Sequence, residues 1–173
     1  EENIRIASTL GAAIPDSLPT MSLQISQSDQ IFAREWLSSH SMQNNSNLLG
    51  IHAGSATVKN QIQKRWSADH YAMLCAMASK ELSMDILLFG GPEERNLNEQ
   101  ISSKIINLHP KATIQIVEKA SLPQSIAIMS HCTAFVSNDS GLMHCAAALQ
   151  LPMISIFGYT SHIQIVPWMH DKA

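Results

Sequence analysis

The residues best suited to chemistry lie in one short segment, Ser137 to His144, which reads Ser-Asn-Asp-Ser-Gly-Leu-Met-His. An apolar run typical of a strand precedes it and a run typical of a helix follows it. Asn138, Asp139 and Ser140 are each good helix N-caps. Gly141 permits close approach to the backbone, and the free N–H groups and positive dipole end of a helix start suit a phosphate. The segment therefore predicts the phosphate-facing edge of a nucleotide-dependent enzyme domain.

Two further loops follow predicted strands at comparable positions. In the first, His-Ala-Gly-Ser, the backbone N–H groups of Gly54 and Ser55 would face a phosphate; the alternative is an ordinary turn into a surface loop. In the second, Gly-Gly-Pro-Glu-Glu, Glu93 or Glu94 would accept hydrogen bonds from ribose hydroxyls; the alternative is ordinary acidic residues of a first helical turn. Because the carboxyl ends of parallel strands open on one edge of the sheet, we expect all three loops to meet there.

A basic pair, Lys64 and Arg65, precedes a helix cap at Ser67. The long loop 56–63 would fold the pair back over the same edge. A lysine is a compact charge suited to a diphosphate, and an arginine can make paired hydrogen bonds to one. The alternative is a solvated basic pair, and in either case Trp66 is expected to be a packing anchor.

The remaining ionisable side chains do not predict a metal site. His144 lies one turn into the last predicted helix, where it would either adjoin the phosphate loop or be an ordinary packed histidine. The other histidines considered show no metal-ligand spacing: His40, His70, His109, His131, His162 and His170. Cys75, Cys132 and Cys145 also lack such spacing, so we expect buried, reduced thiols.

Length and composition limit the class of protein. The chain has 173 residues, of which 45% are hydrophobic and 14% charged, which is enough for one domain with a real core. A net charge of −3 gives no broad attraction to nucleic acid or to an anionic membrane surface. The P-loop, GxGxxG and GxSxG patterns are missing, which argues against a kinase, a GTPase, a dehydrogenase and a serine hydrolase. The first residue is not Met, and we expect a piece of a longer protein without a signal peptide or membrane span.

The order of the predicted elements indicates an α/β fold. Strands alternate with helices, which predicts a mainly parallel sheet with helices on both faces. A further short strand is expected at 21–25, and a helix capped by Ser28 or Asp29 should follow it. The other strands are expected at residues 48–52, 85–89, 113–117, 134–137 and 153–157.

Four stretches of the chain resemble the C-terminal domain of the family 9 glycosyltransferases, the lipopolysaccharide heptosyltransferases and their relatives. These stretches read HAGS, KRW, LLFGGPEE and FVSNDSGLMHCAAALQLPMISIFG. The resemblance runs from about Leu48 to Thr160, and the segment Glu2 to Leu37 is similar to the family's connection into its second domain. It implies the second half of a GT-B enzyme, with two Rossmann-like domains around a cleft. Residues 1–27 would connect from a missing N-terminal domain, and residues 28–173 would bind the nucleotide sugar.

The resemblance also implies roles for particular residues. Backbone groups of the first and third loops would hold the diphosphate, which Lys64 would neutralise, and one of the two glutamates would bind ribose. Asp139 would contact the sugar or orient Lys64, and His144 would brace the loop. The donor-binding residues so implied are Gly54, Ser55, Lys64, Glu93, Glu94, Asp139, Ser140, Gly141 and His144. No metal and no cofactor is implied, because the nucleotide sugar is itself the substrate.

The activity implied is transfer of a sugar, heptose from ADP-heptose, to a lipopolysaccharide-core acceptor. The catalytic base is expected in the N-terminal domain, so this chain alone would bind the donor but not turn it over. The enzyme would be cytoplasmic, or peripheral at the inner face of a Gram-negative inner membrane. Two alternatives remain open: another GT-B transferase or an epimerase that uses a UDP-sugar, and a non-catalytic module that binds a nucleotide sugar.

Overall fold

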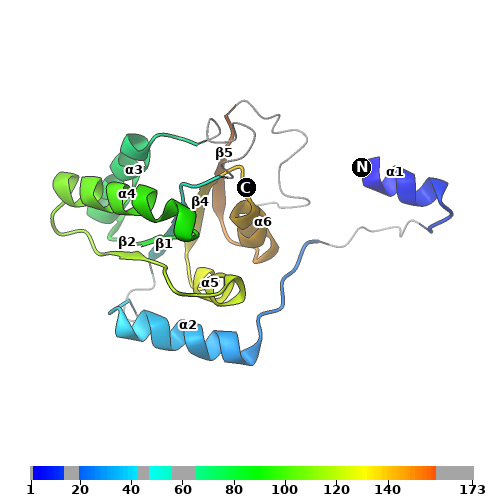
Figure 1. Cartoon of the computed structure of the whole chain (residues 1–173), viewed down its shortest axis with the longest axis horizontal. Coiled ribbons are helices and arrows are strands. Elements are labelled where there is room, and N and C mark those ends of the chain that lie inside the picture. Colours follow the sequence, from blue (N-terminus) through cyan, green and yellow to red (C-terminus); the bar gives the residue numbers. More distant parts are fainter. Residues whose placement is uncertain (1, 14–19, 43–46, 56–64, 159–173) are drawn as a thin grey trace.

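The computed structural model describes residues 2–13, 20–42, 47–55 and 65–158, and five parallel strands form its centre (Figure 1). The strand order across the sheet is β3-β2-β1-β4-β5. The strands are β1 (Leu48–His52), β2 (Asp85–Leu88), β3 (Ile114–Ile116), β4 (Ala134–Asn138) and β5 (Met153–Ile156). The Rossmann-like α/β fold predicted from the sequence is therefore confirmed. The order reverses between β1 and β4, which is where ligands bind in open parallel sheets.

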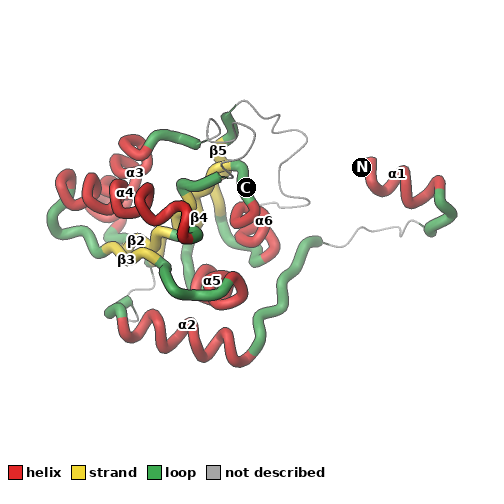
Figure 2. Tube along the Cα trace, viewed as in Figure 1, coloured by secondary structure: helices red, strands yellow, loops and turns green. Residues whose placement is uncertain are grey.

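Helices cover both faces of the sheet (Figure 2). On one face α3 packs against α4, and on the other α2 packs against α5, with α6 beside α5. The helices are α1 (Glu2–Thr9), α2 (Gln27–Ser39), α3 (Ala68–Leu82), α4 (Arg95–Leu108), α5 (Leu122–Met129) and α6 (Gly141–Ala148), with a short 3-10 turn, η2 (Pro92–Glu94), before α4. Burial on both faces explains why the central strands read as continuous apolar runs.

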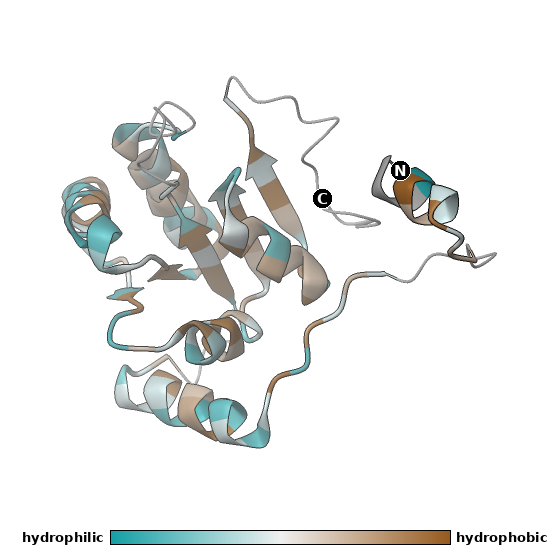
Figure 3. Ribbon diagram, turned by 45° about the vertical axis from the view of Figure 1, so that its right-hand side comes forward, coloured by the Kyte–Doolittle hydropathy of each residue, from teal (hydrophilic) through white to brown (hydrophobic). Residues whose placement is uncertain are grey.

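Successive strand residues divide between two apolar cores, one on each face of the sheet. Leu48 belongs to the core under α2, α5 and α6, whereas Leu49 belongs to the core under α3 and α4. This follows from the two-residue period of side chains along a strand. Gly50 pairs with Phe135 of β4 and leaves room for its ring. A Cβ on Gly50 would lie 2.4 Å from Cδ2 of Phe135. The strands are coloured mostly as hydrophobic, whereas the helices around the sheet alternate between hydrophilic and hydrophobic residues (Figure 3).

Serine caps start several helices, as the sequence predicts. Ser67 accepts a hydrogen bond from the His70 N–H at the start of α3, and Ser121 forms a capping box at the start of α5. The predicted cap of α2 is wrong, because Ser26 accepts from the Asp29 N–H at 3.1 Å and the helix begins at Gln27. Asp29 instead lies in the first turn, where a carboxylate interacts favourably with the helix dipole.

Two predicted elements differ in the structure. Residues 21–25 form no strand; Met21 and Ile25 pack against the core on the α2 side, so their alternation reflects side-chain packing and not strand pairing. The predicted helix from Glu93 begins at Arg95, after the 3-10 turn of η2. That turn changes the direction of the chain just before α4, and Glu94 ends it.

The cysteines are free thiols, as predicted. Cys75 and Cys132 are buried and Cys145 is half-buried, and burial raises the pKa of Cys75 to about 12. Among the residues that the structure describes, no helix is both long enough and apolar enough to cross a bilayer.

Candidate functional site

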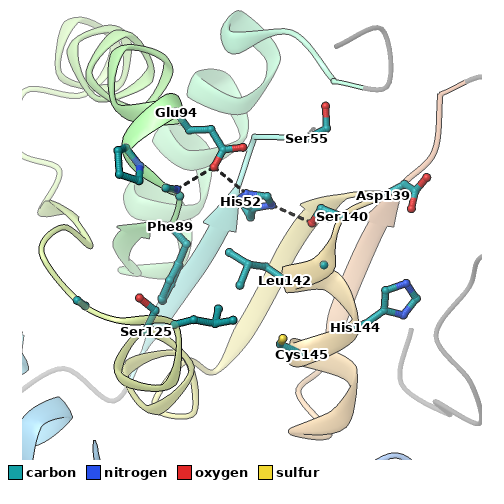
Figure 4. A pocket seen from close by; sticks show the side chains of 16 residues that line it. His52, Ser55, Phe89, Glu94, Ser125, Asp139, Ser140, Leu142, His144 and Cys145 are labelled. Carbon is teal, nitrogen blue, oxygen red and sulfur yellow. Dashed lines mark hydrogen bonds and ion pairs between the residues drawn. The ribbon is translucent and has the colours of Figure 1, made fainter. Parts of the chain in front are cut away.

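The loops that follow β1, β2 and β4 meet at one edge of the sheet, which confirms their predicted convergence. The register places Ile51 beside Leu88 and His52 beside Ser137, so the three strands end at nearly the same level. Together with the start of α5, the loops enclose a pocket of about 720 Å³ (Figure 4). The pocket lies at the reversal of strand order, the place where the fold favours ligand binding.

His52, the last residue of β1, is the central polar group of this pocket. Its side chain is buried, and both ring nitrogens have partners. Nδ1 lies 2.9 Å from Ser140 Oγ, and Nε2 lies 3.3 Å from Glu94 Oε2. The ring thus joins the start of α6 to the end of η2, two segments that the sequence separates widely (Figure 4).

Glu94 is held from three sides. Its Oε2 also accepts a hydrogen bond from the Gly91 N–H at 2.9 Å, and its Oε1 lies 3.8 Å from Arg65 Nη2. Burial by itself raises the pKa of this carboxyl, but the His52 hydrogen bond and charge, the Gly91 N–H and Arg65 outweigh it and lower the pKa. Glu94 is therefore an ionised acceptor at neutral pH. Gly54 packs directly against it, since a Cβ at that position would lie 1.6 Å from Oε1.

Arg65 is not a solvated charge, because two of its guanidinium nitrogens bond to the loop after β1. Its Nη2 donates to the Ser55 carbonyl at 2.6 Å and its Nε donates to Ser55 Oγ at 3.2 Å. Its side chain is 15% exposed. The alternative of a solvated basic pair is therefore wrong for Arg65, whose paired hydrogen bonds hold the loop after β1. Lys64 lies outside the described residues.

Asn138, at the end of β4, ties the loop after β1 to the start of α3. Its Nδ2 donates to the Ala53 carbonyl at 2.7 Å and to the Gly54 carbonyl at 3.4 Å. Its Oδ1 accepts from the Trp66 N–H at 3.0 Å. The Trp66 ring packs edge-on against Tyr71 with ring centroids 5.2 Å apart, which confirms Trp66 as a packing anchor.

The start of α6 forms one wall of the pocket. Ser140 is the N-cap, and its Oγ accepts from the Met143 N–H at 3.4 Å. Gly141 is exposed, and a Cβ added there would meet nothing within 4 Å, so its backbone is open to a ligand. Asp139 is buried beside it and its N–H donates to the Ile156 carbonyl at 3.2 Å. The first helical N–H groups have no partners within the helix, so this wall suits an anion.

His144 and Glu93 have weaker connections to the pocket than their neighbours. His144 lines the pocket, but its ring makes no hydrogen bond to another described residue. Within the loop, Ser137 Oγ donates to the Asn138 carbonyl at 2.8 Å and lies 3.1 Å from Ser140 Oγ. Glu93 is exposed and does not line the pocket, whereas Glu94 does. Of the two glutamates, the structure therefore brings only Glu94 to the predicted site.

Sequence reasoning missed two features of the site. It gave His52 no role of its own and considered Asn138 only as a possible helix N-cap, although each is a polar residue at the end of an otherwise apolar strand, which is a usable signal. His52 lines the pocket, whereas Asn138 is buried and does not line it. Sequence reasoning also missed the apolar wall, because apolar residues at helix starts read as ordinary core. That wall comprises Phe89, Leu122, Leu142 and Cys145.

A second, smaller pocket of about 250 Å³ adjoins the first across Gly90, Gly91 and Pro92, which line both. Residues 116–119 line only this second pocket, and Ala120 lines both. At its rim Arg95 makes a paired ion pair with Glu118, with N···O distances of 3.0 and 2.8 Å. The two pockets are thus neighbours that share the turn after β2.

The arrangement offers distinct chemistry at each position. Open helix N–H groups suit an anion, and an ionised carboxylate suits a ligand hydroxyl. Within the described part of the chain, no three His, Cys, Asp or Glu side chains are grouped so that they could hold a metal ion.

Comparisons with known proteins find similar sequences within one family. The family model described as glycosyltransferase family 9 (heptosyltransferase) matches residues 2–173. Lipooligosaccharide heptosyltransferase 2 of Haemophilus influenzae is 36% identical over 110 residues, which is 64% of this chain and 31% of that protein. Lipooligosaccharide heptosyltransferase 2 of Campylobacter jejuni is 34% identical over 140 residues, which is 76% of this chain and 40% of that protein. The chain thus spans well under half the length of these relatives.

Solved structures show the same fold. The structure of E. coli ADP-heptose lps heptosyltransferase II aligns with a TM-score of 0.74 at 26% identity, covering 92% of this chain and 46% of that one. A glycosyl transferase family 9 structure from Veillonella parvula aligns with a TM-score of 0.78 at 25% identity, covering 95% of this chain and 44% of that one. The similarity therefore extends over nearly the whole of this chain.

Proposed function

The chain belongs to glycosyltransferase family 9, and on that premise we propose that it binds the nucleotide-sugar donor of a heptosyltransferase. The donor proposed is ADP-heptose, and the acceptor is a lipopolysaccharide core. The observation that carries the proposal is the pocket at the ends of β1, β2 and β4. It presents the open start of α6 on one side and the ionised Glu94 on the other.

The donor fits this pocket in one direction. The diphosphate lies against the backbone of Ser140 and Gly141, where N–H groups and the helix dipole favour negative charge. The ribose hydroxyls donate to Glu94, and the base continues into the smaller pocket beyond Gly91. The sugar then lies toward Asp139, whose carboxylate accepts from its hydroxyls.

Transfer breaks the bond between the sugar and the diphosphate, so negative charge grows on the leaving diphosphate. Donors that are already oriented toward that charge stabilise the transition state without reorganisation. The backbone at the start of α6 supplies such donors in this chain, and Lys64 supplies a positive charge. The acceptor hydroxyl must lose a proton to a base, which we assign to a part of the enzyme outside this chain. We further propose that transfer needs no metal.

The acceptor sets where the enzyme works. A lipid-linked core presents its sugar at a membrane surface, so we place the reaction at the cytoplasmic face of an inner membrane. The relatives' names support the acceptor class, since they are lipooligosaccharide and lipopolysaccharide heptosyltransferases.

Calorimetric titration of the chain with ADP-heptose, ADP and UDP-glucose tests the donor. We expect ADP-heptose to bind at least tenfold more tightly than UDP-glucose, which corresponds to about 1.4 kcal/mol. A preference for UDP-glucose would instead favour another GT-B transferase or an epimerase.

A transfer assay tests the division of labour. With ADP-heptose and a lipopolysaccharide-core acceptor, the chain alone should show no turnover, and the full-length enzyme should show it. A full-length protein that binds donor without transfer would be a binding module. If the chain alone shows turnover, and Asp139→Asn abolishes it, the catalytic base that takes the acceptor's proton lies in this chain.

A further inference from the structure

His52 connects the two sides of the pocket that hold different parts of the donor. Its Nδ1 lies 2.9 Å from Ser140 Oγ on the diphosphate side, and its Nε2 lies 3.3 Å from Glu94 Oε2 on the ribose side. Figure 4 shows the ring between these two partners. A histidine bonded at both nitrogens and facing a pocket is well placed to respond to a charged ligand.

The partner of Nε2 determines where this ring carries its hydrogen. The pKa of Glu94 is lowered, so its carboxylate is ionised near neutral pH and can only accept hydrogen bonds. Nε2 must therefore carry a hydrogen whether the ring is neutral or charged. The remaining nitrogen, Nδ1, is the position that gains or loses a proton, and it faces Ser140.

The state of Nδ1 fixes the direction of the Ser140 hydroxyl. Ser140 Oγ already accepts from the Met143 N–H. When Nδ1 is bare, the only hydrogen of the hydroxyl is donated to it. When Nδ1 is protonated, it donates to Ser140 Oγ, and the hydroxyl hydrogen is released. Ser137 Oγ, 3.1 Å away, can receive that hydrogen in the free protein, and a phosphate oxygen can receive it in the complex.

We propose that His52 is a positioning residue that takes up one proton when the donor binds and thereby turns the Ser140 hydroxyl toward the diphosphate. The proton comes from solvent and forms the Nδ1–H bond; no other covalent bond changes. The inference rests on the proposed function, because the ligand that drives it is a nucleoside diphosphate sugar. His52 acts through the Ser140 hydroxyl and does not contact the reacting atoms.

The charges around His52 support proton uptake. Glu94 from η2 is the ionisable group in direct contact with the ring, and Arg65, from the segment before α3, reaches it only through Glu94. The other ionisable groups that line the same pocket are Asp139 from the loop after β4 and His144 and Cys145 from α6. Glu94 contacts the ring directly, and the same carboxylate lies 3.8 Å from Arg65 Nη2. A bound diphosphate adds negative charge on the Ser140 side, which shifts the balance toward the imidazolium form.

Calorimetry with ADP-heptose in two buffers of different ionisation enthalpy measures this proton directly. Both phosphates of ADP-heptose are esterified, so the ligand lacks the second phosphate ionisation near pH 6. We expect net proton uptake and an affinity that falls roughly three- to tenfold from pH 6 to pH 8, within the limit set by one linked proton. The affinity of the His52→Gln variant for ADP-heptose should change less than twofold over that pH range. His144→Gln, the matched control, should keep the pH dependence.

The outcomes separate this inference from the proposed function. Binding of ADP-heptose without proton uptake, or a pH dependence lost in His144→Gln and kept in His52→Gln, overturns the role of His52 alone. No binding at any pH overturns the proposed function as well. Imidazole 15N shifts of the unmutated protein at pH 7 give a readout that does not depend on folding of a variant. His52 Nδ1 should become protonated when ADP-heptose binds, and an unchanged Nδ1 shift would contradict the proposal.

Discussion

The pocket has two walls of opposite character. The polar wall, formed by the end of β1, the loop after β4 and η2, contains His52 and Glu94, which are bonded to each other. The fully buried Asn138 does not line the pocket but supports this wall, because it donates to the Ala53 carbonyl and accepts from the Trp66 N–H. The apolar wall, formed by the starts of α5 and α6, contains Leu122, which is 60% exposed, and the half-buried Leu142. The polar wall is fixed before a ligand arrives, whereas the apolar wall leaves surface for a ligand to cover.

This difference assigns different tasks to the two walls. Polar groups that are already oriented bind charge and hydroxyls without reorganisation, which gives orientation and specificity. Apolar surface contributes affinity in proportion to the area covered and discriminates little. Changes to the polar wall should therefore affect stability and donor recognition together, and changes to the apolar wall should affect affinity only slightly.

The largest expected effect is on the stability of the polar wall. Asn138→Ala removes the partners of the Ala53 carbonyl and the Trp66 N–H in a fully buried position. Unsatisfied buried groups cost about 1–3 kcal/mol each, so urea denaturation should show a loss of about 2–6 kcal/mol in the free energy of unfolding. Leu122→Ala, the control on the apolar wall, should change it by less than about 0.5 kcal/mol. Equal losses for the two variants would remove the distinction between the walls.

The next effect distinguishes the two adjacent glutamates. Glu94→Gln removes the charge that would accept the ribose hydroxyls, so the Kd for ADP-heptose should rise about tenfold, or about 1.4 kcal/mol. Glu93→Gln is the matched control, because Glu93 is exposed and lies outside the pocket lining. Calorimetry should find that Glu93→Gln binds ADP-heptose with the affinity of the wild type. A larger loss of affinity in Glu93→Gln than in Glu94→Gln would show that Glu93, and not Glu94, contacts the ribose.

A smaller effect is expected on the apolar wall. Leu122→Ala removes three carbon atoms from a side chain that the ligand only partly covers, so the affinity for ADP-heptose should fall by about 0.5–1 kcal/mol. The same variant should leave the ratio of ADP-heptose to UDP-glucose affinity unchanged. A changed ratio of these two affinities would show that the apolar wall also contributes to the choice of donor.

The smallest effect concerns acid stability. The pKa of Glu94 is lowered in the folded chain, so its contribution to stability is present above the ordinary glutamate pKa of 4.5 and is lost as the pH falls through the folded value. Urea denaturation of the wild type should therefore show a steeper loss of stability below about pH 4.5 than Glu94→Gln. Parallel curves for the two proteins would mean that the contacts of Glu94 do not stabilise the fold.

The fold could be predicted closely because its signal is local. Strands buried on both faces read as apolar runs, and Ser67 and Ser121 cap helices through contacts three residues away. Residues 21–25 misled the prediction since apolar alternation also arises where Met21 and Ile25 pack their side chains on a core without strand pairing.

The site could be predicted only in outline. The three loops follow from topology, but the contact between His52 and Ser140 spans 88 positions and depends on the register of β1 with β4. The choice between Glu93 and Glu94 depends on the turn of η2, whose direction no local pattern gives. Arg65 has the residue type of a phosphate ligand, and only its hydrogen bonds to Ser55 show that it holds the protein's own loop.

The central claim is that the donor lies across the polar wall, and a crystal structure of the chain with ADP-heptose tests it most directly. We expect the diphosphate within hydrogen-bond distance of the backbone N–H groups at Ser140 and Gly141, and the ribose hydroxyls at Glu94. Density for the nucleotide at a different place, or a diphosphate turned away from the start of α6, would contradict the account.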